Sequence, residues 1–302
     1  MEQSGVAAVP NQSAPAGETV DPYHLDESTG IFEPRSPIAH RDEEYPSQGF
    51  ESMLRMQSRH FWYRGRHRFI RFVTTEIVSA CAGRLEAVDL GGGCGAWLKY
   101  LDATSPQLFG SLALADSSRL GLQLAAPLLP RGVPRYHVDL LNLQWHERWD
   151  VAFLLDVLEH VPDDERALRQ IRAALRPGGH LVMTMPALER FRTRVDDMSR
   201  HVRRYSRRDL ARRAAAAGFE VVVSRYFMFF LSPLLLLTRL GAPDPSTLTP
   251  AEIRDYLNRS DRVPPAAANA LLAAIFAMET PLGVWLPFPW GTSVLAVFRR
   301  PA

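Results

Sequence analysis

Apolar segments of strand length alternate with segments of helical periodicity through most of the chain. The first buried strand is predicted over residues 85–90, and an amphipathic helix follows it directly. Six further segments have strand character, at 111–116, 135–140, 149–155, 180–187, 220–227 and 292–300. Because helices separate most of these strands, the pattern predicts an α/β protein with a mostly parallel sheet and helices on both faces.

The same pattern divides the chain into five parts. Residues 1–48 are rich in Pro, Ser, Gly and acidic residues, which predicts a disordered or loosely attached arm. A helical cap is predicted over 49–84, before an α/β core over 85–225. An insertion over 226–290 then separates the sixth strand from the last strand, which lies in 291–302. A tight connection between the sixth and the last strand would need only a few residues, so an insertion of this length is expected to have a function or packing role of its own.

The insertion contains two very apolar segments, 226–240 and 266–286, and neither has a polar stripe. A helix that is apolar all round is buried or faces lipid. Pro233 interrupts the first segment and the second carries Glu279, so neither is expected to span a bilayer. Three roles remain open for the insertion: a lid over a hydrophobic substrate, an interface of a homodimer, and a peripheral contact with a membrane.

The composition narrows the class of protein. The 302 residues are 46% hydrophobic and 23% charged, as in globular proteins. A net charge of +2 and the lack of a zinc module or RNA-binding motif give no reason to expect a nucleic-acid partner. The two cysteines, Cys81 and Cys94, form no disulfide framework and no metal motif. The first 20 residues lack the pattern of a secretory leader. We therefore expect a cytoplasmic protein without a metal, with the inner membrane face as the alternative location.

A glycine-rich turn, VDLGGGCG, follows the first predicted strand. Glycines allow a ligand to approach the backbone closely, and the following helix offers free N–H groups. Gly91, Gly93 and Ala96 fit the G-x-G-x-x-[GA] pattern of dinucleotide sites. An alternative pattern is D-x-G-x-G-x-G, which starts at Asp89. A carboxylate at that place suits a ligand with an ammonium group and suits a pyrophosphate poorly.

Two later segments, LLDVLEHV and LRPGGHLVMTMP, favour the second pattern. Together with VDLGGGCG they resemble the class I S-adenosylmethionine-dependent methyltransferases, and more narrowly the bacterial group that acts on small molecules and lipid-linked substrates. The resemblance covers roughly residues 55–300. It implies a Rossmann-like fold with a seven-stranded sheet whose last strand runs antiparallel. It also implies S-adenosylmethionine as cofactor.

The resemblance assigns cofactor-binding roles to four residues near the glycine turn. Asp89 is expected to face the methionine ammonium group, directly or through water. Gly91 and Gly93 should let the backbone approach the methionine and ribose. Asp116, at the end of the second strand, should accept hydrogen bonds from both ribose hydroxyls. The alternative for each aspartate is an ordinary surface carboxylate.

Five further residues are expected around the same ligand. Asp139 should accept a hydrogen bond from the adenine amino group, with the Leu140 N–H beside the ring, although an Asp before a turn is common. Asp156 begins the segment nearest the methyl group. Trp62, or alternatively Tyr63, should stack near the cofactor, and Arg64 should clamp its carboxylate. The alternative is that the helix carrying Trp62 and Arg64 only packs on the sheet.

Two histidines are the candidate catalytic bases. His160, in LEHV, follows the fourth strand, and His201, in SRHVRRYS, follows the fifth. A pKa near 6.5 suits histidine to this role. The alternatives are that His160 only orients a loop or contacts the cofactor, and that His201 only binds the substrate. The seven arginines of 199–213 form a solvated helix face or contact an anionic substrate or membrane.

These observations predict methyl transfer to a small, hydrophobic or lipid-linked acceptor, with O-methylation favoured over N- and C-methylation. Two rival hypotheses remain from other classes. One is an NAD-dependent oxidoreductase, which the dinucleotide pattern would fit. The other is a cofactor-binding protein without turnover.

Overall fold

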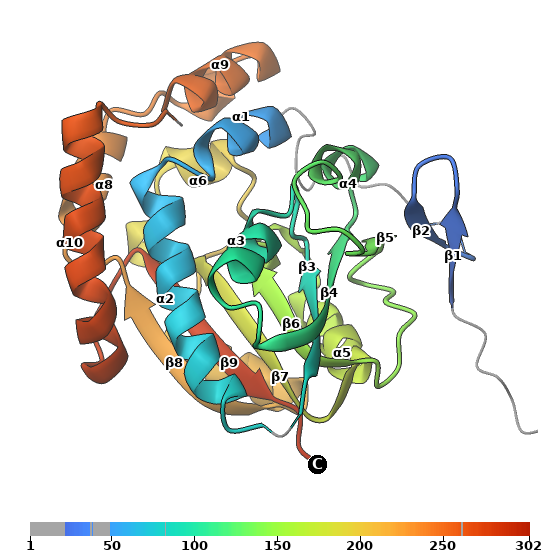
Figure 1. Ribbon diagram of the computed structural model, residues 1–302. Helices are drawn as coiled ribbons and strands as arrows, with labels where there is room; N and C mark the ends of the chain where they lie inside the picture. Colours follow the sequence, from blue (N-terminus) through green and yellow to red (C-terminus); the bar gives the residue numbers. More distant parts are fainter. Residues whose placement is uncertain (1–21, 37, 39–48, 82, 261) are drawn as a thin grey trace, which may run out of the picture.

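A mixed nine-stranded sheet forms the centre of the computed structural model, which describes residues 22–36, 38, 49–81, 83–260 and 262–302 (Figure 1). The strand order is β1-β2-β5-β4-β3-β6-β7-β9-β8. Five neighbouring strands are parallel: β3 (Leu85–Leu90), β4 (Phe109–Asp116), β5 (Arg135–His137), β6 (Trp149–Leu155) and β7 (Leu175–Pro186). The last strand, β9 (Ser293–Arg299), pairs antiparallel with β7 and with β8 (Glu220–Phe227). The predicted α/β class and the antiparallel last strand are thereby confirmed.

Two strands lie where a loose arm was expected. Within the predicted arm of 1–48, β1 (Tyr23–Asp26) and β2 (Ile31–Pro34) form a hairpin, and β2 pairs parallel with β5. Asp26 accepts hydrogen bonds from Ser28 and Thr29 and so fixes the turn, while Ile31 is fully buried. The expectation was wrong for these residues, and the sheet has nine strands instead of seven. The remainder of 1–48, apart from 22–36 and 38, lies outside the described residues.

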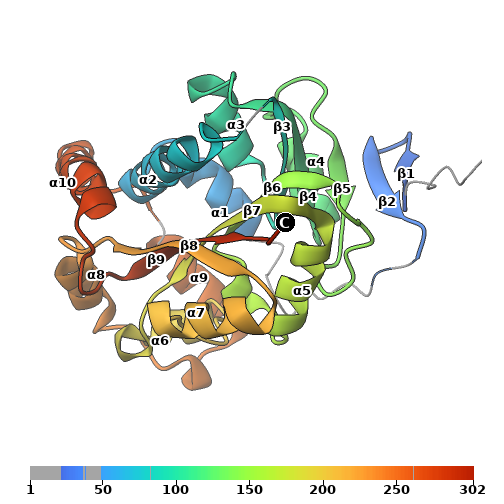
Figure 2. The same ribbon diagram turned by 90° about the horizontal axis from the view of Figure 1, so that it is seen from below.

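Helices cover both faces of the sheet (Figure 2). One face is covered by α2 (Phe61–Val78), α3 (Ala96–Thr104), α4 (Arg119–Ala125) and α10 (Ala266–Trp285). The other face packs against α5 (Asp164–Ala174) and α7 (Arg207–Ala216). As the sequence predicts, α7 begins after the N-cap Ser206 and is followed by Gly218 with a positive φ of 76°.

The insertion between β8 and β9 is helical, as expected, but its first residues are not. Residues Tyr226 and Phe227 still belong to β8, and the first apolar helix, α8, covers only Ser232–Arg239. A short 3₁₀ turn (Pro245–Thr247) and the more polar α9 (Pro250–Ser260) then lead to α10. The remaining short elements are α1 (Gly49–Met56), η1 (Leu158–His160), η2 (Glu189–Phe191) and α6 (Arg194–Met198).

Helix α10 packs directly on α2 at a position without a side chain. A Cβ atom added at Gly65 would overlap the ring of Phe276, which is fully buried. Gly65 therefore lets the two helices approach closely. Since α2 also packs on the sheet through Phe69 and Ile70, this contact fixes the insertion to the core.

This contact predicts that Gly65→Val destabilises the protein. The new side chain must push Phe276 aside, and overpacking of this kind costs about 1–3 kcal/mol of unfolding free energy. Urea denaturation of both proteins measures the difference. Gly241→Val is the matched control, since a Cβ there meets no atom within 4 Å. Equal destabilisation by both substitutions would contradict the proposed role of Gly65.

Candidate active site

A cavity of about 670 Å³ opens beside the carboxyl ends of the parallel strands. Ligands of open α/β sheets bind at this edge, where the loops after the strands converge. One wall is polar and contains the glycine turn and the aspartates near the ends of β3, β4, β5 and β6: Asp89, Asp116, Asp139 and Asp156. A second group of lining residues is apolar and comes from the insertion: Leu231 directly before α8, Leu234, Leu235 and Leu236 of α8, and Leu272 of α10. The sequence-predicted aspartates are therefore brought together.

Asp116 holds the glycine turn in place. Its Oδ2 accepts a hydrogen bond of 2.8 Å from Gly93 N, and its Oδ1 accepts one of 2.7 Å from Ser118 N. Gly91 and Gly93 have positive φ values of 69° and 54°, a conformation that favours glycine. A Cβ at Gly93 would also crowd Phe50 and Met53 at 3.3 Å. Helix α1 therefore covers this turn, a contact that the sequence did not predict.

Asp89 is a buried carboxyl group with an unused oxygen. Its exposed fraction is 2%, and Oδ1 has no hydrogen-bond partner among the described residues. Burial raises the pKa of Asp89 to about 8, with a smaller contribution from the neighbouring Asp116 carboxylate and an opposing one from Arg66. Such a group is stabilised by a cationic partner. The ammonium group of S-adenosylmethionine fits this requirement.

The far end of the polar wall is formed after β5. Asp139 and Leu140 both line the cavity, as the resemblance implies. One carboxylate oxygen of Asp139 accepts a hydrogen bond of 2.8 Å from Leu141 N, which fixes the turn. The two residues are thus held at the same edge as Asp116, on the strand that neighbours β4.

Helix α2 presents a different arginine to the cavity from the one expected. Trp62 and Arg66 both line it, and the Arg66 guanidinium lies 4.6 Å from the centre of the Trp62 ring. Arg66 also forms an ion pair with Asp156, whose φ of 57° is unusual for a residue other than glycine. Arg64 is exposed and is not among the lining residues. The prediction for Arg64 was wrong because residues four apart share a helix face, whereas residues two apart do not.

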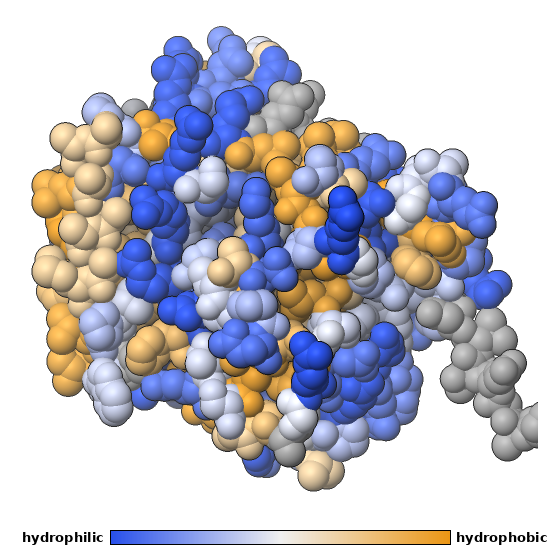
Figure 3. All heavy atoms as spheres, viewed as in Figure 1, coloured by the Kyte–Doolittle hydropathy of each residue, from blue (hydrophilic) through white to orange (hydrophobic). Residues whose placement is uncertain are grey.

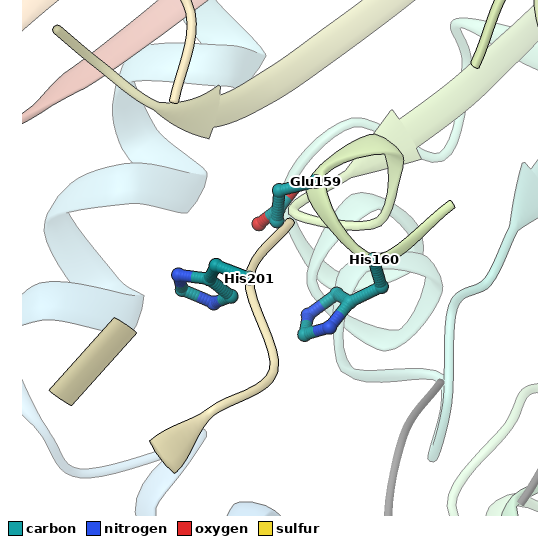
Figure 4. Close-up of side chains that lie close together, drawn as sticks. All are labelled: Glu159, His160 and His201. Carbon is teal, nitrogen blue, oxygen red and sulfur yellow. The ribbon is translucent and has the colours of Figure 1, made fainter. Parts of the chain in front are cut away.

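His160 and His201 both line the cavity and contact each other. Their ring centres are 5.0 Å apart, and both rings lie beside the buried Glu159 (Figure 4). His160 comes from η1 after β6, and His201 comes from the loop that follows α6. Their proximity could not be read from the sequence, in which they are separated by forty residues.

Asp196 fixes the orientation of His201. Its Oδ1 lies 2.9 Å from His201 Nδ1 and also accepts a bond from Arg204 Nε at 2.9 Å. Burial alone would raise the pKa of Asp196, but the His201 hydrogen bond and the Arg204 guanidinium hold it well below its ordinary value. Nδ1 of His201 therefore donates to a carboxylate, which leaves Nε2 as the acceptor of the neutral ring.

Glu159 was missed by the sequence analysis. Its exposed fraction is 1%, and its Oε2 has no hydrogen-bond partner among the described residues. Burial, and then the nearby Asp156 carboxylate, raise the pKa of Glu159 well above its ordinary value. The only signal in the sequence was its position directly before His160.

The donor atoms of Glu159, His160 and His201 all lie within 4.8 Å of one another, a grouping that could hold a metal ion. The sequence analysis expected no metal. The positive charges of Arg66 and Arg204 act on Glu159 and oppose a divalent cation at this place.

The family was identified by comparison with known proteins. A family profile described as a methyltransferase domain matches residues 58–224, which is more than half of the chain. The chain belongs to this family. The resemblance to class I S-adenosylmethionine-dependent methyltransferases is thus confirmed, and the protein is a methyltransferase. A search of curated proteins found no match.

Solved structures share the fold of this methyltransferase. The N-methyltransferase NodS from Bradyrhizobium japonicum, solved with S-adenosylhomocysteine, has a TM-score of 0.52 at 16% identity, covering 86% of this chain and 100% of that chain. The [4+2]-cyclase SpnF has a TM-score of 0.53 at 20% identity, covering 80% and 83%. A chain in the complex of the Haloferax volcanii Trm112 activator with a methyltransferase has a TM-score of 0.54 at 16% identity, covering 85% and 99%. At such identities these likenesses show the fold alone.

The burial of Asp89 predicts a specific pH dependence of stability. With a pKa of about 8 against 3.8, the folded carboxyl group keeps a proton that the unfolded chain releases. Stability should therefore fall as pH rises across this interval. Asp89→Asn removes this effect. As pH rises, the unfolding free energy of the variant should therefore increase relative to that of the wild type, by up to about 1.4 kcal/mol per pH unit.

Thermal unfolding of the ligand-free proteins from pH 5 to pH 8 measures this gain. Glu159, whose pKa is also raised, contributes to the pH dependence of stability in both proteins, so its contribution cancels when the variant is compared with the wild type. Asp102→Asn serves as control, because Asp102 is exposed on α3. A difference between Asp89→Asn and wild type that stays constant with pH would contradict the raised pKa.

Proposed function

We propose that this methyltransferase uses S-adenosylmethionine to methylate a hydroxyl oxygen of a hydrophobic, lipid-linked acceptor. The observation that carries the proposal is the division of the cavity. The cavity is lined both by a group of aspartates, in which Asp89 is buried with an unpaired oxygen, and by leucines, mainly of α8. The aspartates suit the polar cofactor and the leucines suit an acceptor with a large apolar part.

Each part of the polar wall has a proposed role toward the cofactor. Asp89 binds the ammonium group, and the open backbone at Gly91 and Gly93 accommodates the methionine and ribose. Asp116 receives the ribose hydroxyls. Asp139, together with the Leu140 N–H, receives the adenine. These roles use the carboxylates and backbone groups that line the cavity after β3, β4 and β5.

The α2 side closes the site. Trp62 covers the cofactor, and Arg66 takes the role that the sequence analysis gave to Arg64, beside the methionine carboxylate. The ion pair between Arg66 and Asp156 holds the guanidinium in place at the end of β6. Asp156 thereby positions the segment nearest the transferred group.

S-adenosylmethionine supplies a methyl group on a positively charged sulfur. His201 would accept the proton of the acceptor hydroxyl at Nε2 as that oxygen takes the methyl group, while the methyl–sulfur bond breaks and S-adenosylhomocysteine leaves. Asp196 holds the His201 ring through Nδ1 and Arg204 holds Asp196. His160 lies against His201 and is the second candidate for the proton. Alignment in a water-poor cavity supplies much of the rate, on the order of 7–11 kcal/mol in well-oriented reactions.

The alternatives are less well supported. In an NAD-dependent oxidoreductase the pyrophosphate would lie on the glycine turn, and the buried carboxyl group of Asp89 would have no cationic partner there. A carboxylate or thiolate acceptor would have no need of a base, yet two histidines line the cavity. A non-catalytic binding protein would also have no use for the His201–Asp196 pair.

Radiolabelled S-adenosylmethionine tests the proposed function. The protein is incubated with an extract of its own organism, and the products are partitioned between organic and aqueous phases. Label in the organic phase supports a lipid-linked or otherwise hydrophobic acceptor. Label in the aqueous phase alone would contradict the proposed acceptor class, and no label with any fraction would point to a protein that binds without turnover.

His201→Asn is expected to lower kcat by about 10²–10⁴-fold, since the variant lacks the proton acceptor. Binding of S-adenosylhomocysteine, measured by calorimetry, should be unchanged. His160→Asn is the parallel test, and His146→Asn is the control because His146 is exposed outside the cavity. Full turnover in both cavity variants would refute the base hypothesis. EDTA should leave wild-type turnover unchanged, which separates a proton acceptor from a metal ligand.

A further inference from the structure

The helices α8 and α10 both lie at one edge of the molecule (Figure 1), and an apolar band runs along α10 at this edge (Figure 3). Along α10, Leu271, Met278 and Trp285 point outward, and Trp285 has an exposed fraction of 75%. Along α8, Leu237 and Leu240 have exposed fractions of 64% and 76%. Scattered apolar residues are normal on a surface, but a contiguous group of this kind marks a site of interaction.

The surface carries no charge along the whole of α10. Its single charged residue, Glu279, is turned inward and is fully buried, where it accepts hydrogen bonds from Phe229 N and Phe230 N. Two tryptophans, Trp285 and Trp290, are exposed at the end of the helix. Tryptophan is enriched where proteins meet the boundary between water and lipid.

Helix α10 cannot leave the protein to cross a bilayer without losing its core contacts. It is the one helix among the described residues that is long and apolar enough to do so by length and composition. However, Phe276 is buried against Gly65 of α2, and Glu279 is tied to the chain after β8. The helix is therefore held flat against the core, with its outer side free to lie in a membrane surface.

The same surface borders the cavity. Leu234 of α8 is exposed and also lines the cavity, and Leu235 and Arg239 of α8 line it as well. An apolar substrate could pass along α8 into the cavity without crossing water. A second copy of the chain on this face would cover Leu234 and close that path.

We propose that the outer faces of α8 and α10 dock on a lipid bilayer, so that the cavity receives its acceptor directly from the membrane. This inference rests on the proposed function, because it explains how a lipid-linked acceptor reaches the histidines. The docked helices lie in the plane of the membrane with Leu237, Leu240 and Trp285 in the acyl boundary.

Flotation of the full-length protein with vesicles tests the docking. One set contains phosphatidylcholine alone and the other adds phosphatidylglycerol. Wild type is expected to float with both sets, with a blue shift of its tryptophan fluorescence. The triple variant Leu237→Gln, Leu240→Gln, Trp285→Gln should bind at least about tenfold more weakly, because it loses the buried apolar area. The matched control changes exposed apolar residues elsewhere, Leu25→Gln and Leu120→Gln, and should bind as wild type does.

Three results would overturn the docking proposal. The first is that the wild type does not float with vesicles, and the second is that the triple variant binds vesicles as well as the wild type does. The third is that light scattering shows a dimer of the wild type and a monomer of the triple variant, while flotation is the same for both. Circular dichroism and S-adenosylhomocysteine binding show whether the triple variant is folded.

Transfer of label to lipid in detergent micelles separates this proposal from the proposed function. If label is transferred to lipid in micelles but the protein does not bind vesicles, the docking proposal fails and the proposed function stands. If the protein binds vesicles but label appears only in the aqueous phase, the docking proposal stands and the proposed acceptor class fails.

Discussion

A carboxyl group buried without a partner is the constraint on which the rest of this site depends. Asp89 is the penultimate residue of β3 in the middle of the sheet, where burial disfavours its charged form. The fold keeps the group there because Gly92 leaves space beside it, and Asp116 fixes the glycine turn by accepting hydrogen bonds from Gly93 N and Ser118 N. A buried carboxyl group whose charged form is destabilised in this way is typical of sites that bind an opposite charge.

Helix α2 connects the two halves of the molecule. One side of it presents Trp62 and Arg66 to the polar wall of the cavity. Another side brings Gly65 against Phe276 of α10, which supports the apolar insertion. The polar and the apolar lining of the cavity are therefore both supported by the same helix.

Much of the fold and half of the site could be predicted from the sequence. Each aspartate of the polar wall lies near the end of a strand, so the strand pattern and the D-x-G-x-G-x-G turn were enough to place it. The β1–β2 hairpin was missed because two four-residue strands in a polar segment give no periodicity. The exposure of Arg64 could have been predicted, since helical phase places Arg66, and not Arg64, on the face of α2 that carries Trp62. The contact of Glu159 and His160 with His201 was not predictable, because it depends on how the loops after β6 and β7 meet in space.

Calorimetric titration of S-adenosylhomocysteine tests the central claim most directly, namely that Asp89 is the partner of a cationic ligand. The titration is done at pH 7 in buffers with different ionisation enthalpies, and the slope gives the protons released on binding. The pKa of Asp89 is about 8 in the ligand-free protein, so binding of an ammonium group should release about one proton. The Asp89→Asn variant should release none. Tight binding without proton release, or binding of NADH alone, would contradict the account.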